Sequence, residues 1–236
     1  MRRYAQPLRQ GRRRYRLRKK DNHVKSILII GLGRFGSHIC MILHDMGHEI
    51  LVVDTSEERV QKMLPYATNG LVADSTDKSF LESLGIPNFD ICLVTIGDDF
   101  QSSMETTALL KDLGAKLVVS RASRGIHENL LRRCGADVTV YPEKQTAFLT
   151  ALRYGSDSLF EYFIISKDYA VCEVAIPQAW IGKTVGDLNI RKNYHINILA
   201  LKKGEELTAE ITPQTVFTED HTILILGKKE TLEQFY

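Results

Sequence analysis

Two kinds of apolar pattern alternate along the chain from Val24 onward. Short, continuous runs rich in β-branched residues, such as VKSILII, indicate strands that are buried on both faces. Longer segments, such as Arg34 to Met46, have apolar residues every three or four positions and indicate amphipathic helices. This alternation predicts an α/β fold with a doubly wound parallel sheet, in which a helix connects each strand to the next.

The alternation extends through a sixth predicted strand and then changes. We expect strands over 24–30, 50–54, 70–73, 91–96, 116–120 and 137–141, and helices over 34–46, 57–64, 77–84, 100–113, 124–134 and 144–153. From Tyr169 the sequence pattern predicts a smaller α+β domain, with strands over 169–176, 195–201 and 222–226 and a short helix near Val185. These patterns divide the chain into a Rossmann domain (24–145), a crossover helix and linker (146–168) and a C-terminal domain (169–236).

Composition excludes several classes of protein. Hydrophobic residues make up 44% of the 236 positions and charged residues 25%, a balance that allows a packed core. No apolar run approaches the roughly 20 residues of a membrane-spanning helix, and no secretory signal is recognisable. The four cysteines, Cys40, Cys92, Cys134 and Cys172, lie far apart without CxxC spacing, which favours small core residues in a reducing cytoplasm.

A basic leader precedes the first predicted strand. Residues 1–20 hold ten of the 31 basic residues and no acid, so the rest of the chain carries 29 acidic against 21 basic residues. Such an arm is able to attract nucleic acid or anionic lipid, but blocks of like charge are commonly solvated tails. We expect residues 1–23 to be disordered and expect no nucleic-acid partner.

The motif GLGRFG places Gly31, Gly33 and Gly36 between a predicted strand and a predicted helix. In this context the first glycine permits a tight turn, the second lets the backbone approach a pyrophosphate, and the third allows close packing of helix and strand. Asp54 ends the next strand, where its carboxylate can accept both ribose hydroxyls and disfavours a 2′-phosphate. The motif predicts nucleotide binding. The alternative is that the glycines only shape a turn and Asp54 only caps a helix.

The chain lacks the residues of a hydride-transfer site. From Val24 onward no tyrosine is followed four positions later by a lysine. His44 and His48 have ligand spacing, but Gly47 lies between them at a helix end, and His127 has no evident carboxylate to orient it. The C-terminal domain also leaves little room for a substrate pocket. These features argue against an enzyme.

Four ordered segments, GLGRFG, LVVDTSEERV, ADSTD and PEKQ, resemble the RCK (KTN) regulatory domains of Ktr and Trk potassium-uptake systems, most closely the Ktr regulatory subunits. The resemblance extends from Val24 to the C-terminus. It implies that Gly31, Gly33, Phe35 and Gly36 surround the phosphates of ATP or ADP and that Asp54 holds the ribose. It further implies that Arg34 senses the terminal phosphates; the alternative for Arg34 is an exposed residue at a helix start.

The same resemblance implies roles for four further residues. Asp74 and Ser75 would lie near the adenine, although Asp74 would equally serve as a helix cap. Arg121 would add positive charge to the cleft. Glu143 matches a family glutamate associated with a divalent or sodium cation near the nucleotide and a subunit interface; the alternative is a plain surface acid.

A second ligand site is implied in the C-terminal domain. The segment VGDLNIRKNYHINIL resembles the cyclic di-AMP site of some Ktr regulators. The matching positions are Val185, Asn189, Ile190, Arg191, Asn197 and Ile198. In this resemblance the apolar residues bracket the bases and Arg191 lies near a phosphate, whereas the alternative for Arg191 is a solvated surface arginine.

The family resemblance implies a cytoplasmic subunit that associates with the inner face of the membrane through a channel partner. Dimers of the chain would assemble into an octameric ring beneath a membrane potassium-channel subunit. ATP would then activate the channel by binding its open form more tightly than ADP does. Two other functions remain open at this stage: an NAD(H)-binding redox sensor, which would bind DNA through the basic arm, and a small NAD-dependent oxidoreductase.

Overall fold

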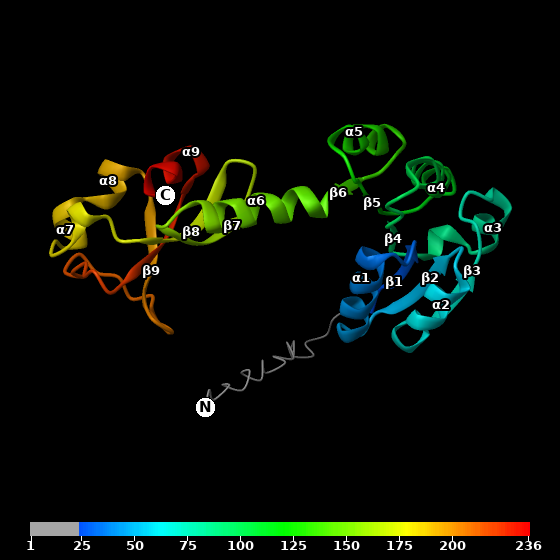
Figure 1. Ribbon diagram of the computed structural model, residues 1–236, viewed down its shortest axis with the longest axis horizontal. Coiled ribbons are helices and arrows are strands. Elements are labelled where there is room, and N and C mark those ends of the chain that lie inside the picture. Colours follow the sequence, from blue (N-terminus) through cyan, green and yellow to red (C-terminus); the bar gives the residue numbers. More distant parts are fainter. Residues whose placement is uncertain (1–23) are drawn as a thin grey trace, which may run out of the picture. The chain divides into compact units, whose positions relative to one another are not determined.

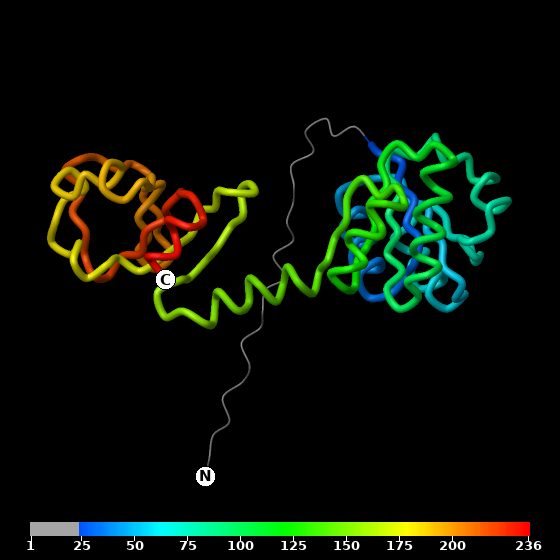
Figure 2. Tube along the Cα trace, turned by 90° about the horizontal axis from the view of Figure 1, so that it is seen from above, coloured from blue at the N-terminus to red at the C-terminus, as the bar shows by residue number. Residues whose placement is uncertain are grey.

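The computed structural model describes residues 24–236, so the predicted basic leader of residues 1–23 lies outside the described residues. The chain separates into two compact units, with the boundary after Pro142 (Figures 1 and 2). Within the described residues no helix is both long and apolar enough to cross a membrane.

The first unit is a parallel sheet with the strand order β3-β2-β1-β4-β5-β6, which confirms the predicted doubly wound fold. Its strands are β1 (Ser26–Ile30), β2 (Glu49–Asp54), β3 (Asn69–Val72), β4 (Ile91–Val94), β5 (Val118–Arg121) and β6 (Val138–Val140). Its helices are α1 (Arg34–Asp45), α2 (Glu57–Met63), α3 (Lys78–Ser83), α4 (Phe100–Asp112) and α5 (Gly125–Arg133), with short 3-10 turns η1 (Leu64–Tyr66) and η2 (Ile86–Asn88).

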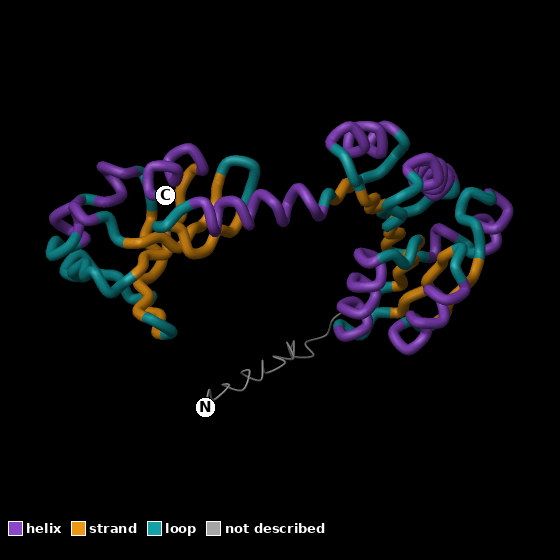
Figure 3. Tube along the Cα trace, viewed as in Figure 1, coloured by secondary structure: helices purple, strands orange, loops and turns teal. Residues whose placement is uncertain are grey.

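Strand β1 is buried on both faces, as its unbroken apolar sequence requires. Ile27 and Ile29 pack with buried residues of α1 and α2 on one face. Leu28 and Ile30 pack with buried residues of α3 and α4 on the other. Helices therefore lie on both sides of the strands (Figure 3).

The strand order reverses direction between β1 and β4. The chain moves from β1 outward to β2 and β3, then returns to place β4 on the other side of β1. At such a switch point the loops after the two strands diverge and leave a crevice at the carboxyl edge of the sheet. This edge positions the candidate site.

The second unit is an antiparallel sheet with the strand order β10-β9-β11-β8-β7. The strands are β7 (Leu159–Ile164), β8 (Tyr169–Ala175), β9 (Asn197–Lys203), β10 (Glu206–Thr208) and β11 (Thr222–Lys228). The helices are α6 (Pro142–Gly155), α7 (Val185–Leu188), α8 (Ile190–Tyr194) and α9 (Lys229–Leu232), with 3-10 turns η3 (Gln178–Trp180) and η4 (Glu233–Phe235).

Two strands of this sheet were not predicted from the sequence. Strand β7 falls within the segment interpreted as crossover helix and linker, and its alternation is hidden because Phe163 and Ile164 are both exposed. Strand β10 is short and all three of its residues are exposed, so it has no buried apolar face to reveal it. Both are edge strands, where one neighbour suffices and the hydrophobic signal is weakest.

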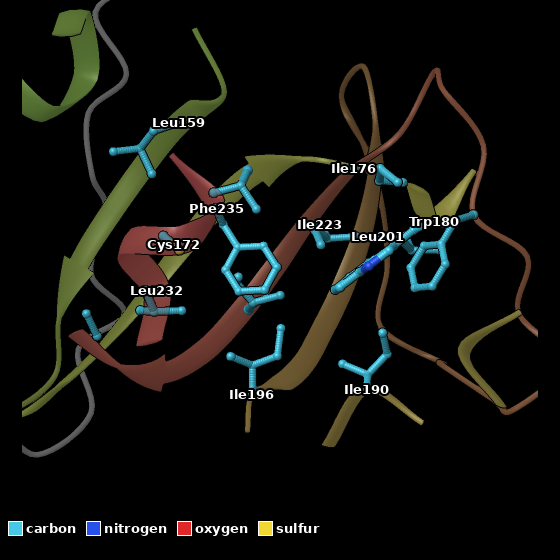
Figure 4. Close-up of a cluster of buried hydrophobic side chains, with 14 of the residues drawn as sticks. Leu159, Cys172, Ile176, Trp180, Ile190, Ile196, Leu201, Ile223, Leu232 and Phe235 are labelled. Atoms are coloured by element: carbon cyan, nitrogen blue, oxygen red, sulfur yellow. The ribbon is translucent and has the colours of Figure 1, made fainter. Parts of the chain in front are cut away.

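One face of the antiparallel sheet carries the core of the second unit (Figure 4). Trp180 and Phe235 pack with their ring centroids 5.6 Å apart, and Trp180 Nε1 donates a hydrogen bond of 3.1 Å to Tyr194 Oη. Cys172 and Ile225 come from neighbouring strands and are fully buried in the same cluster. The C-terminal residues thus complete this core.

Candidate functional site

The turn between β1 and α1 contains three glycines, and the space around each of them differs. Gly31 has a φ of +96°, and a Cβ there would lie 2.8 Å from the Ile96 nitrogen. A Cβ at Gly36 would lie 2.1 Å from the carbonyl oxygen of Gly31, so helix and turn touch directly. A Cβ at Gly33 would have no atom within 4 Å. Gly33 therefore borders open space where a ligand can approach the backbone.

The amino end of α1 is arranged to receive an anion. Gly33 is its N-cap and provides no capping side chain, and Ser37 N donates to the Gly33 carbonyl oxygen at 2.9 Å. The amides of the first turn, Arg34 to Gly36, precede this ladder and point out of the helix end, where the helix dipole favours negative charge. Arg34 is exposed at the same end, and Phe35 is half-buried.

Asp54 connects the end of β2 to the glycine turn. Its carboxylate is 6% exposed and accepts hydrogen bonds from Leu32 N at 2.6 Å and Ser56 N at 2.8 Å. The N-cap of α2 is Ser56, whose hydroxyl accepts from Arg59 N, so the capping role is filled by another residue. Arg59 Nη1 also lies 3.7 Å from Asp54 Oδ2. The acid thus lies beside the turn, as a ribose-binding residue would.

Asp74 and Ser75 follow β3 and face different environments. Asp74 is exposed, and its Oδ1 accepts from Thr76 N at 2.9 Å and from the Thr76 hydroxyl at 2.8 Å. The N-cap of α3 is Asp77. Ser75 is buried, and its hydroxyl shares a 2.7 Å hydrogen bond with Thr106 of α4. Asp74 therefore remains accessible to a ligand, whereas Ser75 is engaged in packing α4 against this loop.

Arg121, at the end of β5, lies against the loop that follows β4. A Cβ built on Gly97 would be 2.0 Å from Arg121 Nη1. Arg121 Cζ also lies 5.8 Å from the ring centroid of Phe35 in the first turn of α1. The structure therefore brings Arg121, Phe35 and the glycine turn together at the switch point. Gly97 was missed by the sequence analysis because it belongs to no motif.

Thr95 was also missed. It follows β4, is 4% exposed, and donates its hydroxyl to the carbonyl oxygens of Ile30, at 3.1 Å, and of Gly31. This contact fastens the glycine turn to the neighbouring strand. A threonine after an apolar run carries no signal of such a role.

His127, in the first turn of α5, contacts Phe100 and Ser123. Its ring stacks on Phe100 with centroids 3.5 Å apart, and its Nδ1 lies 3.0 Å from the Ser123 hydroxyl. Burial, followed by the positive charge of Arg124, lowers the pKa of His127. These contacts pack the ring against Phe100 and place a hydroxyl beside its Nδ1.

Glu143 is exposed in the first turn of α6 and belongs to the second unit. Within residues 24–236 no group of three or more histidine, cysteine, aspartate or glutamate side chains is placed to hold a metal ion. A cation at Glu143 would therefore need further oxygen ligands from outside this group of side chains.

The six residues matched to a cyclic di-AMP site lie in one continuous stretch from α7 to β9. Asn189 has a φ of 46° between α7 and α8, and Arg191 is exposed. Ile190 is 4% exposed, and Ile198 is partly buried against the same core. Val185 begins α7 and Asn197 begins β9. The two isoleucines thus present little free surface to a ligand in this chain alone.

Comparison with known proteins extends over both units. Residues 27–142 match the TrkA-N domain and residues 171–236 match the TrkA-C domain. Ktr system potassium uptake protein A of Bacillus subtilis (strain 168) is 36% identical over 89% of this chain and 95% of that protein. The chain belongs to the Ktr/Trk family of potassium-uptake proteins. Ktr system potassium uptake protein C of the same organism is 34% identical, with 89% and 96% coverage. The family resemblance drawn from the sequence is thereby confirmed.

Solved structures support the fold of this Ktr/Trk family member. The GsuK channel bound to NAD aligns with a TM-score of 0.63 and 19% identity, and the GsuK RCK domain with 0.59 and 19%. The alignments cover 93% and 91% of this chain. They cover 41% and 47% of the GsuK chains, so the chain spans less than half of each.

Proposed function

We propose that this Ktr/Trk family chain is a regulatory subunit of a potassium-uptake system, controlled by an adenine nucleotide, and that it is not an enzyme. The main support is the match to Ktr protein A, which includes both domains and nearly its whole length.

The nucleotide would bind at the carboxyl edge of the parallel sheet. The amides of the first turn of α1 would hold a phosphate and Asp54 would accept the ribose hydroxyls. Exposed Arg34 would contact the terminal phosphate, and Asp74 would lie near the adenine. ATP and ADP are the proposed ligands; NAD(H) is the alternative, because a channel of the same fold binds NAD.

Two further ligands belong to this proposal. Cyclic di-AMP would bind at the α7–α8–β9 stretch, with Arg191 near a phosphate and the apolar contacts supplied in part by a second copy of the chain. A divalent or sodium cation would bind with Glu143 as one of its oxygen ligands. Both rest on the family resemblance together with the exposure of Arg191 and Glu143.

The chain would act as a homo-oligomer, a dimer that assembles into an octameric ring beneath a membrane potassium-channel subunit at the cytoplasmic face. A groove between α6 and β7, with a volume of about 370 Å³, supports self-association. Leu149 and Phe163 line it and are 41% and 52% exposed. Arg153 and Glu161 line the same groove, so a symmetric partner could pair opposite charges across it.

A thermal-shift titration with ATP, ADP, NADH and cyclic di-AMP tests the nucleotide proposal. Ligand at about 100 times its Kd stabilises the folded chain by roughly 2.7 kcal/mol. Asp54→Ala should weaken all adenine nucleotides, whereas Arg34→Ala should mainly remove the difference between ATP and ADP. Arg133→Ala, an exposed arginine at the end of α5, is the matched control.

The outcomes separate the candidate functions. Increases in melting temperature with ATP and ADP that are lost in Asp54→Ala support the proposed regulatory function. Co-purification of a channel subunit would add evidence for its partner. If Arg34→Ala preserves the discrimination between ATP and ADP, the sensing role is wrong. A shift with NADH alone, accompanied by turnover of carbonyl compounds, would replace the regulatory proposal with an oxidoreductase.

A further inference from the structure

Asn69 and Gly70 are the first two residues of β3, the outer strand of the parallel sheet (Figure 1). Asn69 is the one asparagine in the sequence that is followed by glycine. A glycine in this position has no Cβ, so its amide nitrogen can approach the side-chain carbonyl carbon of the asparagine without steric hindrance. Whether the pair reacts in a folded protein depends on where that amide points and on what it contacts.

The amide of Gly70 points to the open edge of the sheet. Successive backbone N–H groups of a strand point to opposite sides, so every second amide faces the neighbouring strand. Ala73 N donates to the Asp54 carbonyl oxygen of β2 at 3.2 Å, and the register between β2 and β3 is continuous back to Asn69. The amides of Asn69 and Leu71 therefore face β2, and the amide of Gly70 faces away from it. Among the described strands only β2 pairs with β3, so no strand covers the Gly70 amide.

The Gly70 amide contacts the side chain of Asn69 instead. Gly70 N donates to Asn69 Oδ1 at 2.8 Å, and Asn69 is exposed. Because Oδ1 is bonded to Cγ, this hydrogen bond holds the nitrogen beside the carbon that it would attack. A rotation about the Cβ–Cγ bond of the exposed side chain brings Cγ into line with the nitrogen, and water at the open edge can accept the amide proton.

Packing on the side of β3 that faces α2 requires glycine at position 70. A Cβ there would lie 2.8 Å from Val60 Cγ1 and 2.9 Å from Leu64 Cδ2, with Val52 Cγ2 at 3.3 Å. The side chains of α2 and η1 thus lie against the bare backbone of β3. A larger residue at 70 would hinder the attack on Asn69, but it would also overpack this contact. The labile pair is therefore built into the packing of the first unit.

We propose that Asn69 is a modification site, at which the folded chain deamidates without an enzyme and with water as the only co-reactant. The Gly70 nitrogen attacks Asn69 Cγ, a bond forms between this nitrogen and Cγ, and the bond between Cγ and Nδ2 breaks. The proton of the Gly70 amide leaves with Nδ2 as ammonia. Water then opens the cyclic imide at either of its two carbonyl carbons and yields aspartate or isoaspartate. The inference does not depend on the proposed function.

The isoaspartate product would alter the pairing of β3 with β2. In isoaspartate the main chain passes through the former side chain, which adds one methylene group to the backbone ahead of Gly70. Gly70, Leu71 and Val72 pair in register with residues of β2, of which the last is Asp54. A longer backbone at the start of an edge strand displaces this register. The aspartate product keeps the normal backbone and adds only a charge.

Incubation of the folded full chain in warm neutral buffer, followed by peptide mapping with mass spectrometry, tests the proposal. We expect the peptide that contains Asn69 to lose its asparagine form and to gain isoaspartate, which a protein isoaspartate methyltransferase labels. Asn88 is the internal control, because it is exposed and is followed by Phe89, and its peptide should remain unmodified. Asn69→Ser, which has no side-chain amide to lose, should remove the labelling.

Two outcomes would overturn the proposal. Persistence of Asn69 in the folded chain, whether or not it is lost from a urea-unfolded sample in the same buffer, would show that the native edge does not support the attack. Equal loss of Asn69 and Asn88 would show that neither the glycine nor the contact at 2.8 Å matters. Circular dichroism during the incubation confirms that the chain stays folded.

Urea unfolding of the purified isoaspartate form tests the consequence for the sheet. We expect a lower midpoint than for Asn69→Asp, which carries the same charge on a normal backbone. Equal midpoints would overturn the proposed change of register.

Discussion

Alanine substitutions at Gly33 and Gly36 should separate stability from binding within a single turn. At Gly36 an added Cβ would meet the Gly31 carbonyl oxygen at 2.1 Å and Thr95 Oγ1 at 2.5 Å. The Gly31 oxygen belongs to a turn fixed to two strands and Thr95 directly follows β4, so α1 must move away from β1 to relieve both contacts. At Gly33 the same methyl group would have no atom within 4 Å, and the φ of −62° is accessible to alanine.

The magnitudes follow from these contacts. Overpacking a buried contact costs about 1–3 kcal/mol, and a clash with backbone belongs at the upper end. Alanine in a helix recovers up to about 1 kcal/mol relative to glycine. We therefore expect Gly36→Ala to lower the free energy of unfolding by about 2 kcal/mol. For a urea m value of about 2 kcal/mol/M this lowers the midpoint by about 1 M.

Gly33→Ala should behave in the opposite way. Its free energy of unfolding should change by less than about 0.5 kcal/mol, as at an unconstrained surface position. Its affinity for adenine nucleotides should fall, because the methyl group occupies the space through which a phosphate approaches the backbone.

Urea unfolding followed by circular dichroism, and nucleotide titration of the same samples, would measure both effects. A Gly36→Ala midpoint equal to that of the wild type would refute the packing argument. Unchanged nucleotide affinity in Gly33→Ala would refute the placement of the phosphate.

Two further predictions concern buried groups. Burial raises the pKa of Cys92 and Cys172 to about 12, so almost no thiolate forms at either residue at pH 8. A disulfide reagent should therefore modify the half-buried Cys134 first. Rapid modification of Cys92 or Cys172 in the native chain would contradict this expectation. Glu173, 4% exposed, accepts from Lys202 Nζ at 3.0 and 3.1 Å, so Glu173→Ala should destabilise the second unit by about 1–3 kcal/mol in thermal melts, with exposed Glu206→Ala as the control. Equal melting temperatures for Glu173→Ala and Glu206→Ala would show that the buried Glu173–Lys202 pair contributes nothing to stability.

The glycine turn could be located from the sequence because its signals are local. A buried strand, three spaced glycines and a helical period lie within one short stretch, and Asp54 ends the adjacent strand. The doubly wound parallel sheet also followed from the regular alternation of strands and helices. Each of these features is specified by neighbouring residues, so sequence reasoning reaches them.

Other parts of the site depend on contacts between distant residues. Gly97 and Arg121 come together only because β4 and β5 are adjacent, and neither residue has an unusual neighbour in sequence. The role of Thr95 likewise depends on the pairing of β1 with β4. Strand β7 escaped prediction for a different reason, since Phe163 and Ile164 break the alternation that identifies a half-buried strand. Such features require knowledge of the tertiary arrangement.

The bonds that fasten the glycine turn have a consequence for how the chain could transmit a signal. Gly31 N donates to the Val53 carbonyl oxygen at 2.8 Å, Leu32 N donates to Asp54, and Thr95 holds the Gly31 carbonyl oxygen. The turn is thus ordered during folding, and its conformational entropy has been lost before any nucleotide arrives. Binding need not rearrange it. Under the proposed function, a change that distinguishes one nucleotide from another would then originate in exposed side chains such as Arg34 rather than in the backbone of the turn.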